Sequence, residues 1–144
     1  TMSYLNLVHQ MEKNNIFPVC SNFDPLVLQT QKELDIIDSL DLARSTILHV
    51  SGSDSMLARY YKTAHAFVFP SLYEGFGLPL LESMGYECPV VCSDNSSLPE
   101  VAGNAAIYFN PYDIKSIQFS MEKVLKDKEL QFDMINKGLK QCIK

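Results

Sequence analysis

Basic residues are scarce in this chain. Its 144 residues include 12 lysines and arginines against 17 aspartates and glutamates, which gives a formal net charge of −5 at pH 7. A protein that binds nucleic acid neutralises the phosphates with a patch or stripe of basic side chains, and this sequence offers none. The composition therefore argues against a nucleic-acid partner.

Long apolar runs are also absent. No run approaches the roughly 18 residues that a membrane-spanning helix needs, and no signal peptide, internal repeat or low-complexity segment is recognisable. The length and the 47% content of hydrophobic residues suffice for one domain of ordinary size with a full core. We therefore expect a single globular domain over residues 1–144.

The few cysteines and histidines form no metal-binding pattern. No C-x-x-C pair occurs, and the spacing of Cys88 and Cys92 is not a zinc pattern without a second pair. The histidines, at positions 9, 49 and 65, are scattered and are interpreted as structural. All four cysteines, at positions 20, 88, 92 and 142, are read as free thiols of a reducing cytoplasm. The predicted location is therefore cytoplasmic, and contact with the inner face of a membrane stays open through a part of the protein outside this sequence.

Short apolar runs alternate with segments of helical periodicity. Strands are predicted over residues 16–20, 46–50, 65–70, 89–92 and 105–109. Helices are predicted over 4–13, 26–40, 56–64, from Pro79 onward, 98–103 (a helix or a turn), 114–125 and 130–143. Such alternation is typical of an α/β domain in three layers, with a mostly parallel sheet and helices on both faces.

Two of these segments give specific expectations about burial. The run AFVF within residues 65–70 is unbroken, which suits a strand buried on both faces of a parallel sheet. In the helix over 114–125, the predicted buried stripe is Ile114, Ile117, Met121, Val124 and Leu125, followed by a charged break over residues 126–129.

A glycine loop follows the strand at residues 65–70. It contains Gly75 and Gly77, and Pro79 then suits the first position of a helix. Without a Cβ, the backbone at the two glycines can approach a ligand closely. The N-terminus of the following helix presents free N–H groups and the positive end of its dipole to the same loop. A phosphate or diphosphate is the ligand that this arrangement favours.

Two carboxylates accompany the glycines. Glu74 lies in the loop and Glu82 lies about one turn into the helix. Neither suits a phosphate, but carboxylates bind sugar and ribose hydroxyls through charged hydrogen bonds of about 1.5–3 kcal/mol each. Diphosphate, sugar and ribose together describe a nucleotide sugar. Taken singly, each residue has a simpler interpretation. Glu82 could only complement the helix dipole, Glu74 could be a solvated loop residue, and the glycines could only make a turn. The prediction of a nucleotide-sugar site therefore depends on their combination.

A dinucleotide site is the competing interpretation. Gly75-x-Gly77, with Asp94 at the end of the next predicted strand, imitates part of the fingerprint in which an acid about 20 residues on binds the ribose. However, Leu80 stands where the third glycine belongs, and Glu74 and Pro79 have no role in that pattern.

Residues 74–82, EGFGLPLLE, resemble the E-x7-E signature of glycosyltransferase family 4, whose members are retaining enzymes of the two-domain GT-B fold. The likeness extends to FVFPSLYEGFGLPLLESM and to PVVCSDNSSLPEVAGNAAIYFNPYD, and covers about residues 19–138. The resemblance implies a Rossmann-like domain, the C-terminal, donor-binding half of such an enzyme, cut short at its ends. It also implies transfer of a sugar from a UDP, GDP or ADP carrier to an acceptor hydroxyl, for polysaccharide or glycolipid assembly, without a metal or other cofactor.

The resemblance assigns roles to single residues. Glu74 is the implied catalytic residue, meeting the donor sugar, and Glu82 holds the ribose hydroxyls. Backbone amides of Phe76, Gly77 and Leu78 meet the sugar and diphosphate. The base rests on the loop at Gly52 and Ser53.

The chain departs from the family in two ways that matter. Where members commonly have a glycine before the next strand, this chain has Glu87, which costs about 1–2 kcal/mol if it takes a left-handed conformation, unless the helix ends at Gly85 instead. The acceptor-binding domain and the donor domain's opening strand are not recognisable, so the chain alone is expected to catalyse little or no transfer. A nucleotide-binding module without activity and a nucleotide-sugar epimerase of the same fold stay open as alternatives.

Overall fold

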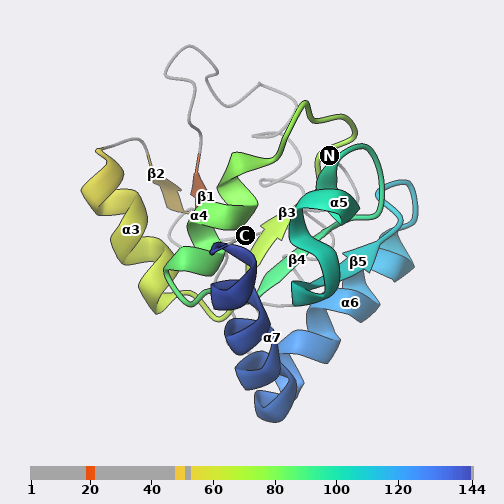
Figure 1. The fold of residues 1–144 in the computed structure, drawn as a ribbon. Coiled ribbons are helices and arrows are strands. Elements are labelled where there is room, and N and C mark those ends of the chain that lie inside the picture. Colours follow the sequence, from red (N-terminus) through yellow and green to blue (C-terminus); the bar gives the residue numbers. More distant parts are fainter. Residues whose placement is uncertain (1–18, 22–47, 51–52, 144) are drawn as a thin grey trace. The chain divides into compact units, whose positions relative to one another are not determined.

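The structure is a computed structural model that describes residues 19–21, 48–50 and 53–143 (Figure 1). The chain divides into two compact units, residues 1–53 and 54–144. In the first unit, β1 (Val19–Ser21) and β2 (Leu48–Val50) pair in parallel, with Val19 opposite Leu48. The predicted helices over 4–13 and 26–40 and the start of the first predicted strand lie outside the described residues.

The second unit contains a parallel three-stranded sheet in the order β3-β4-β5. Its strands are β3 (Phe67–Phe69), β4 (Val90–Ser93) and β5 (Ala106–Phe109), with Val90 opposite both Phe67 and Ala106. A helix follows each strand, as parallel neighbours require. The helices are α3 (Asp54–Thr63), α4 (Leu78–Gly85), α5 (Leu98–Ala102), α6 (Ile114–Lys126) and α7 (Lys128–Gln141), with a 3₁₀ turn at Gly103–Ala105.

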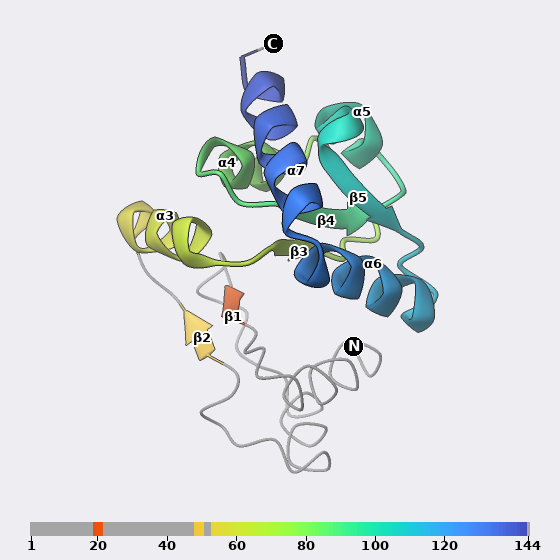
Figure 2. The same cartoon turned by 90° about the horizontal axis from the view of Figure 1, so that it is seen from below.

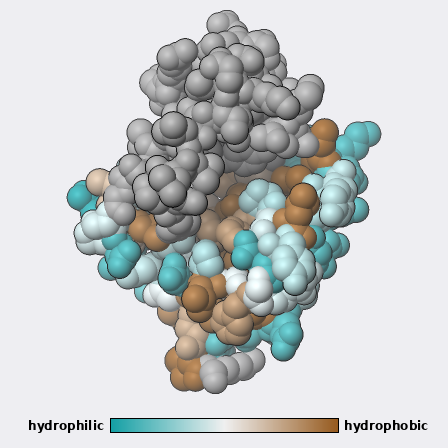
Figure 3. Space-filling model, turned by 90° about the horizontal axis from the view of Figure 1, so that it is seen from above, coloured by the Kyte–Doolittle hydropathy of each residue, from teal (hydrophilic) through white to brown (hydrophobic). Residues whose placement is uncertain are grey.

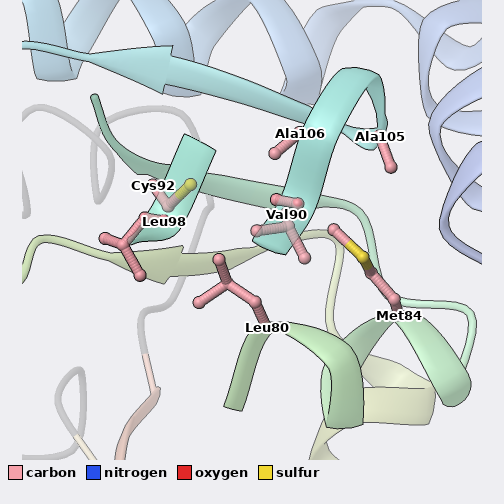
Figure 4. Close-up of a cluster of buried hydrophobic side chains, with 8 residues drawn as sticks. Leu80, Met84, Val90, Cys92, Leu98, Ala105 and Ala106 are labelled. Carbon is pink, nitrogen blue, oxygen red and sulfur yellow. The ribbon is translucent and has the colours of Figure 1, made fainter. Parts of the chain in front are cut away.

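Helices cover both faces of this sheet. Figure 2 shows α4 and α5 on one side of the strands and α6 on the other, which confirms the predicted three-layer α/β architecture. On the α4 side, apolar side chains of the two helices meet the sheet (Figure 4). The members of this cluster are Leu80, Met84, Val90, Cys92, Leu98, Ala102, Ala105 and Ala106.

Burial follows position in the sheet. All four residues of the central strand β4 are buried, because β3 and β5 flank it and helices cover its faces. Every residue of β3 is only half-buried, so the expectation that the AFVF run is buried on both faces is wrong for this sheet. The reason is that β3 is an edge strand of the three-stranded sheet.

The last two helices differ from the sequence prediction at their boundaries. Ile117, Met121 and Val124 of α6 are buried as expected, but Ile114 is 43% exposed. The predicted break over residues 126–129 is shorter in the structure, because only Asp127 separates the end of α6 from the start of α7. Its carboxylate accepts a hydrogen bond of 2.9 Å from the Leu130 amide, which caps α7 and makes a longer break unnecessary.

A left-handed residue, Glu87 with a φ of 63°, follows the end of helix α4. The Glu87 amide donates to the carbonyl of Met84 and the Cys88 amide to that of Ser83, both at 3.0 Å. These two bonds form a Schellman motif with Glu87 at the position usually taken by glycine. The helix does end at Gly85, as the alternative has it, but the left-handed position is taken by Glu87 and not by Gly85.

Candidate functional site

The candidate site is the loop between β3 and α4, together with the loop between β4 and α5. Because both strands run in parallel, the two loops leave the sheet at the same edge, where ligands bind in open α/β sheets. Hydrogen bonds between the loops confirm their proximity: the Asn95 side-chain amide donates to the Leu72 carbonyl at 2.7 Å. Glu74, Gly75 and Gly77 therefore lie where the sequence predicts them.

Glu74 is half-buried and held at several atoms. The Ser71 hydroxyl donates to its carboxylate oxygen Oε1 at 2.8 Å. Its backbone carbonyl accepts from the hydroxyls of Ser96 at 2.7 Å and Ser97 at 3.1 Å. The carboxylate is therefore presented from a loop whose backbone is tied to the neighbouring loop.

The two glycines serve different ends. Gly77 is buried, adopts a φ of 91° and caps the N-terminus of α4. A Cβ there would lie 2.8 Å from Cδ2 of Leu98, so its missing side chain makes room for packing. Gly75 is exposed, and a Cβ there would meet no atom within 4 Å. A side chain would therefore find open space at Gly75, whereas at Gly77 its place is taken by Leu98.

Helix α4 starts directly at the loop. Leu78 is its first residue and Pro79 its second, one position later than predicted, and a proline so close to the start removes no hydrogen bond that the helix needs. Phe76, Gly77 and Leu78, whose amides are the predicted ligand contacts, lead into this N-terminus. The exposed Glu82 follows one turn later, on the same helix.

The charge of Glu82 reaches the hydroxyl of Tyr61 on α3. Burial, and then the nearby charges of Glu82 and Cys88, raise the pKa of Tyr61 well above its ordinary value, so the phenol stays neutral. Its ring packs edge-on against Phe67 at 5.2 Å and stacks on Tyr86 at 6.1 Å between centroids. These contacts fix α3 against the strand and the helix that carry the site.

Apolar side chains surround the candidate site. Tyr73 is 84% exposed and Phe76 is 56% exposed, although both are large. Leu72 and Leu78 are also exposed. Figure 3 shows apolar residues, in brown, among hydrophilic ones on one face of the molecule. The loop therefore offers rings and aliphatic groups to a ligand besides its carboxylate.

The structure describes three of the four other residues singled out in the sequence. Gly52 is not among the described residues, and Ser53 is exposed at the end of the first unit. Asp94 is exposed at the end of β4, and Leu80, where a dinucleotide site has its third glycine, is fully buried in the core. Within residues 53–143, no group of three or more histidine, cysteine, aspartate or glutamate side chains is placed to hold a metal ion.

The sequence predicts no role in the site for four residues whose side chains shape it: Ser71, Asn95, Ser96 and Ser97. Their side chains hold the backbone or carboxylate of residues 72–74. The available signal was their type, because serine and asparagine readily bond to backbone groups in loops. Among the described residues, no helix is long and apolar enough to cross a membrane.

The known proteins that resemble this chain are glycosyltransferases. The family model described as "Glycosyl transferases group 1" matches residues 28–141. O-antigen chain mannosyltransferase B of Escherichia coli is 43% identical over 89 residues, which are 62% of this chain and 23% of that protein. The serotype-specific mannosyltransferase WbdA of Escherichia coli is 38% identical over 117 residues, 81% of this chain and 14% of that protein. The chain thus spans less than a quarter of the length of either relative.

A solved structure shares the fold. The crystal structure of the C-terminal domain of a glycosyl transferase group 1 family protein (LpcC) from Francisella tularensis matches with a TM-score of 0.79. The match covers 99% of this chain and 76% of that one at 20% sequence identity. At that identity the likeness concerns the fold.

Proposed function

Because this chain belongs to the group 1 glycosyl transferases, we propose that residues 71–82 form the donor site of a retaining glycosyltransferase. In this proposal the chain is a Rossmann-like donor domain and the C-terminal half of a GT-B enzyme. The observation that carries the proposal is the grouping of Glu74, Gly77 and Glu82 at the N-terminus of α4. There the half-buried Glu74, a helix N-terminus and the exposed Glu82 follow one another along nine residues.

Each part of the site has a place in the transfer. The N-terminus of α4 and the amides of Phe76, Gly77 and Leu78 stabilise the diphosphate as it leaves with the negative charge. Glu74 stabilises the sugar as positive charge develops at its anomeric carbon. Glu82 accepts hydrogen bonds from the ribose. The acceptor oxygen forms the new bond to the anomeric carbon, and its proton passes to the leaving phosphate oxygen.

The relatives suggest which sugar to test first. O-antigen chain mannosyltransferase B and WbdA are both mannosyltransferases, and the name of the first refers to the O-antigen chain. We propose a mannosyl donor, with GDP-mannose tested first and UDP and ADP conjugates next, and a glycan or glycolipid acceptor bound by another domain. The proposal includes no metal, so EDTA should leave donor binding unchanged. The base contact at Gly52 and Ser53 and the cytoplasmic location stay predictions.

A thermal-shift titration of the chain with UDP, GDP, ADP, their sugar conjugates and NAD tests the donor site. A ligand that binds only the native state stabilises it by about 2.7 kcal/mol at 100 times its Kd. We expect a shift with one nucleoside diphosphate and its sugar conjugate and none with NAD. A shift with NAD alone would overturn the proposal in favour of the dinucleotide site.

A further inference from the structure

Ser96 is a non-glycine residue whose backbone is left-handed. Its φ is 55°, and it lies in the loop between β4 and α5. A side chain in this region of φ is strained, so the surrounding contacts must hold it there. The contacts of its hydroxyl therefore indicate what the left-handed conformation is for.

The Ser96 hydroxyl makes hydrogen bonds to both polar groups of the Glu74 backbone. It donates to the Glu74 carbonyl at 2.7 Å and accepts from the Glu74 amide at 3.3 Å. The hydroxyl of Ser97 donates to the same carbonyl at 3.1 Å. Both polar backbone groups of Glu74 are therefore bonded to side chains 22 or 23 residues further along the chain.

Two further side chains extend the contacts to the rest of residues 71–74. Asn95 donates to the Leu72 carbonyl at 2.7 Å. The Ser71 hydroxyl lies 2.8 Å from the Glu74 carboxylate and 3.2 Å from the Tyr73 carbonyl. Its single proton favours the carboxylate, because a charge-assisted bond is the shorter and stronger one. Ser71 thus sets the direction of the carboxylate, and the loop after β4 sets the position of the backbone.

We propose that Asn95, Ser96 and Ser97, with Ser71, are positioning residues that fix Glu74 for its contact with the donor sugar. This inference rests on the proposed function for the identity of the ligand. It follows from the geometry, because a side chain that must meet a reacting group within a fraction of an ångström needs its own support. The loop has little other support, since Leu72, Tyr73 and Phe76 are all exposed.

The decisive variant is Ser96→Gly. Glycine accepts a φ of 55° without strain, so the substitution removes the hydroxyl while leaving the backbone path allowed. Ser116→Ala is the matched control, because the Ser116 hydroxyl accepts a hydrogen bond of 3.0 Å from the Asn110 amide and so closes the loop after β5 instead. Ser71→Ala and Ser71→Thr form a second pair, in which threonine keeps the hydroxyl.

The first readout is amide hydrogen exchange of Glu74 to Gly77 in the 144-residue chain, followed by NMR. Losing its bond to the Ser96 hydroxyl should speed exchange of the Glu74 amide roughly tenfold, while Ser116→Ala leaves its exchange unchanged. Wild-type exchange in Ser96→Gly would overturn the inference, because the loop would then be fixed by other contacts.

The second readout compares the Kd of GDP with that of GDP-mannose by calorimetry. Ser96→Gly and Ser71→Ala should weaken GDP-mannose binding about fivefold and leave GDP binding within twofold of wild type, which is also the result expected for Glu74→Gln. Ser71→Thr should keep wild-type binding. Equal losses for both ligands, or no loss for GDP-mannose, would overturn the positioning role. If the wild-type chain binds neither probe, GDP-mannose is excluded as the donor, and the support of Glu74 by these four residues is then decided by the exchange rates.

Discussion

At the scale of single residues, the site separates groups that hold the fold from groups that are free to meet a ligand. Gly77 is enclosed by Leu98, whereas Gly75 borders open space. Glu74 is tied to Ser71, while Glu82 is exposed on the helix surface. Residues that look equivalent in the EGFGLPLLE stretch should therefore respond differently to substitution.

The glycines provide the first test. Gly77→Ala should destabilise the chain by about 2 kcal/mol or more, because alanine is strained at a φ of 91° and its Cβ meets Leu98 at 2.8 Å. Gly75→Ala should leave the free energy of unfolding within about 0.5 kcal/mol of wild type but weaken GDP-mannose binding. Urea denaturation and calorimetry of both variants measure this. Similar stability losses in the two would contradict the assignment.

The carboxylates provide the second test. Glu82→Gln should raise the Kd of both GDP and GDP-mannose about tenfold, because the proposed charged hydrogen bond to the ribose would become a neutral one. Glu74→Gln should spare GDP and, in the protein that carries the acceptor site, reduce kcat more than it raises KM. Glu129→Gln, at an exposed glutamate in the first turn of α7, is the control. Equal and small effects from both site variants would count against a sugar contact at Glu74 and a ribose contact at Glu82.

At the scale of elements, α4 is organised by its two ends. Its N-terminus depends on left-handed Gly77, and its C-terminus on left-handed Glu87. The first is a glycine that leaves room for Leu98, whereas the second carries a side chain in a position where glycine is normal. The strain at Glu87 is therefore separable from function.

Exchanging the residue types at the end of α4 should stabilise the chain. Glu87→Gly relieves a left-handed side chain, and Gly85→Ala places a better helix former at a helical position where a Cβ meets nothing within 4 Å. Each change should add about 0.5–1 kcal/mol to the free energy of unfolding, read from the midpoint of denaturation. Donor binding should not change. A loss of stability in Glu87→Gly would show that its side chain makes a contact that outweighs the strain.

At the scale of the whole molecule, the sequence predicts strands and helices, which follow from local patterns of apolar residues. It does not predict contacts between residues that are far apart in the chain. The strand predicted over residues 89–92 is found at Val90–Ser93, and Ile117, Met121 and Val124 of the predicted helical stripe are buried. The hydrogen bonds that hold Glu74 are not readable from the sequence, because they depend on the register between β3 and β4, which brings Ser96 beside a residue 22 positions earlier. The contact of Gly77 with Leu98 is hidden for the same reason.

Buried thiols report on the integrity of the second unit. Burial raises the pKa of Cys88 and Cys92 to about 12, with the charge of Asp94 adding to the effect at Cys92. Because only the thiolate is nucleophilic, iodoacetamide at a pH of about 9 should modify exposed Cys142 faster than either buried cysteine. Urea should abolish the difference, as mass spectrometry of the peptides would show. Fast labelling of Cys92 in the native chain would mean that the sheet opens.

The chain by itself should bind the donor and transfer little or none of it. In the proposed enzyme, the acceptor hydroxyl reaches the anomeric carbon from a second domain, so binding energy at Glu82 and α4 cannot bring the two reactants together in this chain alone. With GDP-mannose and a lipid-linked glycan acceptor, we expect binding by calorimetry and turnover several orders of magnitude below that of a longer protein with both domains. Comparable turnover would show that these 144 residues hold an acceptor site of their own and that the two-domain proposal is wrong.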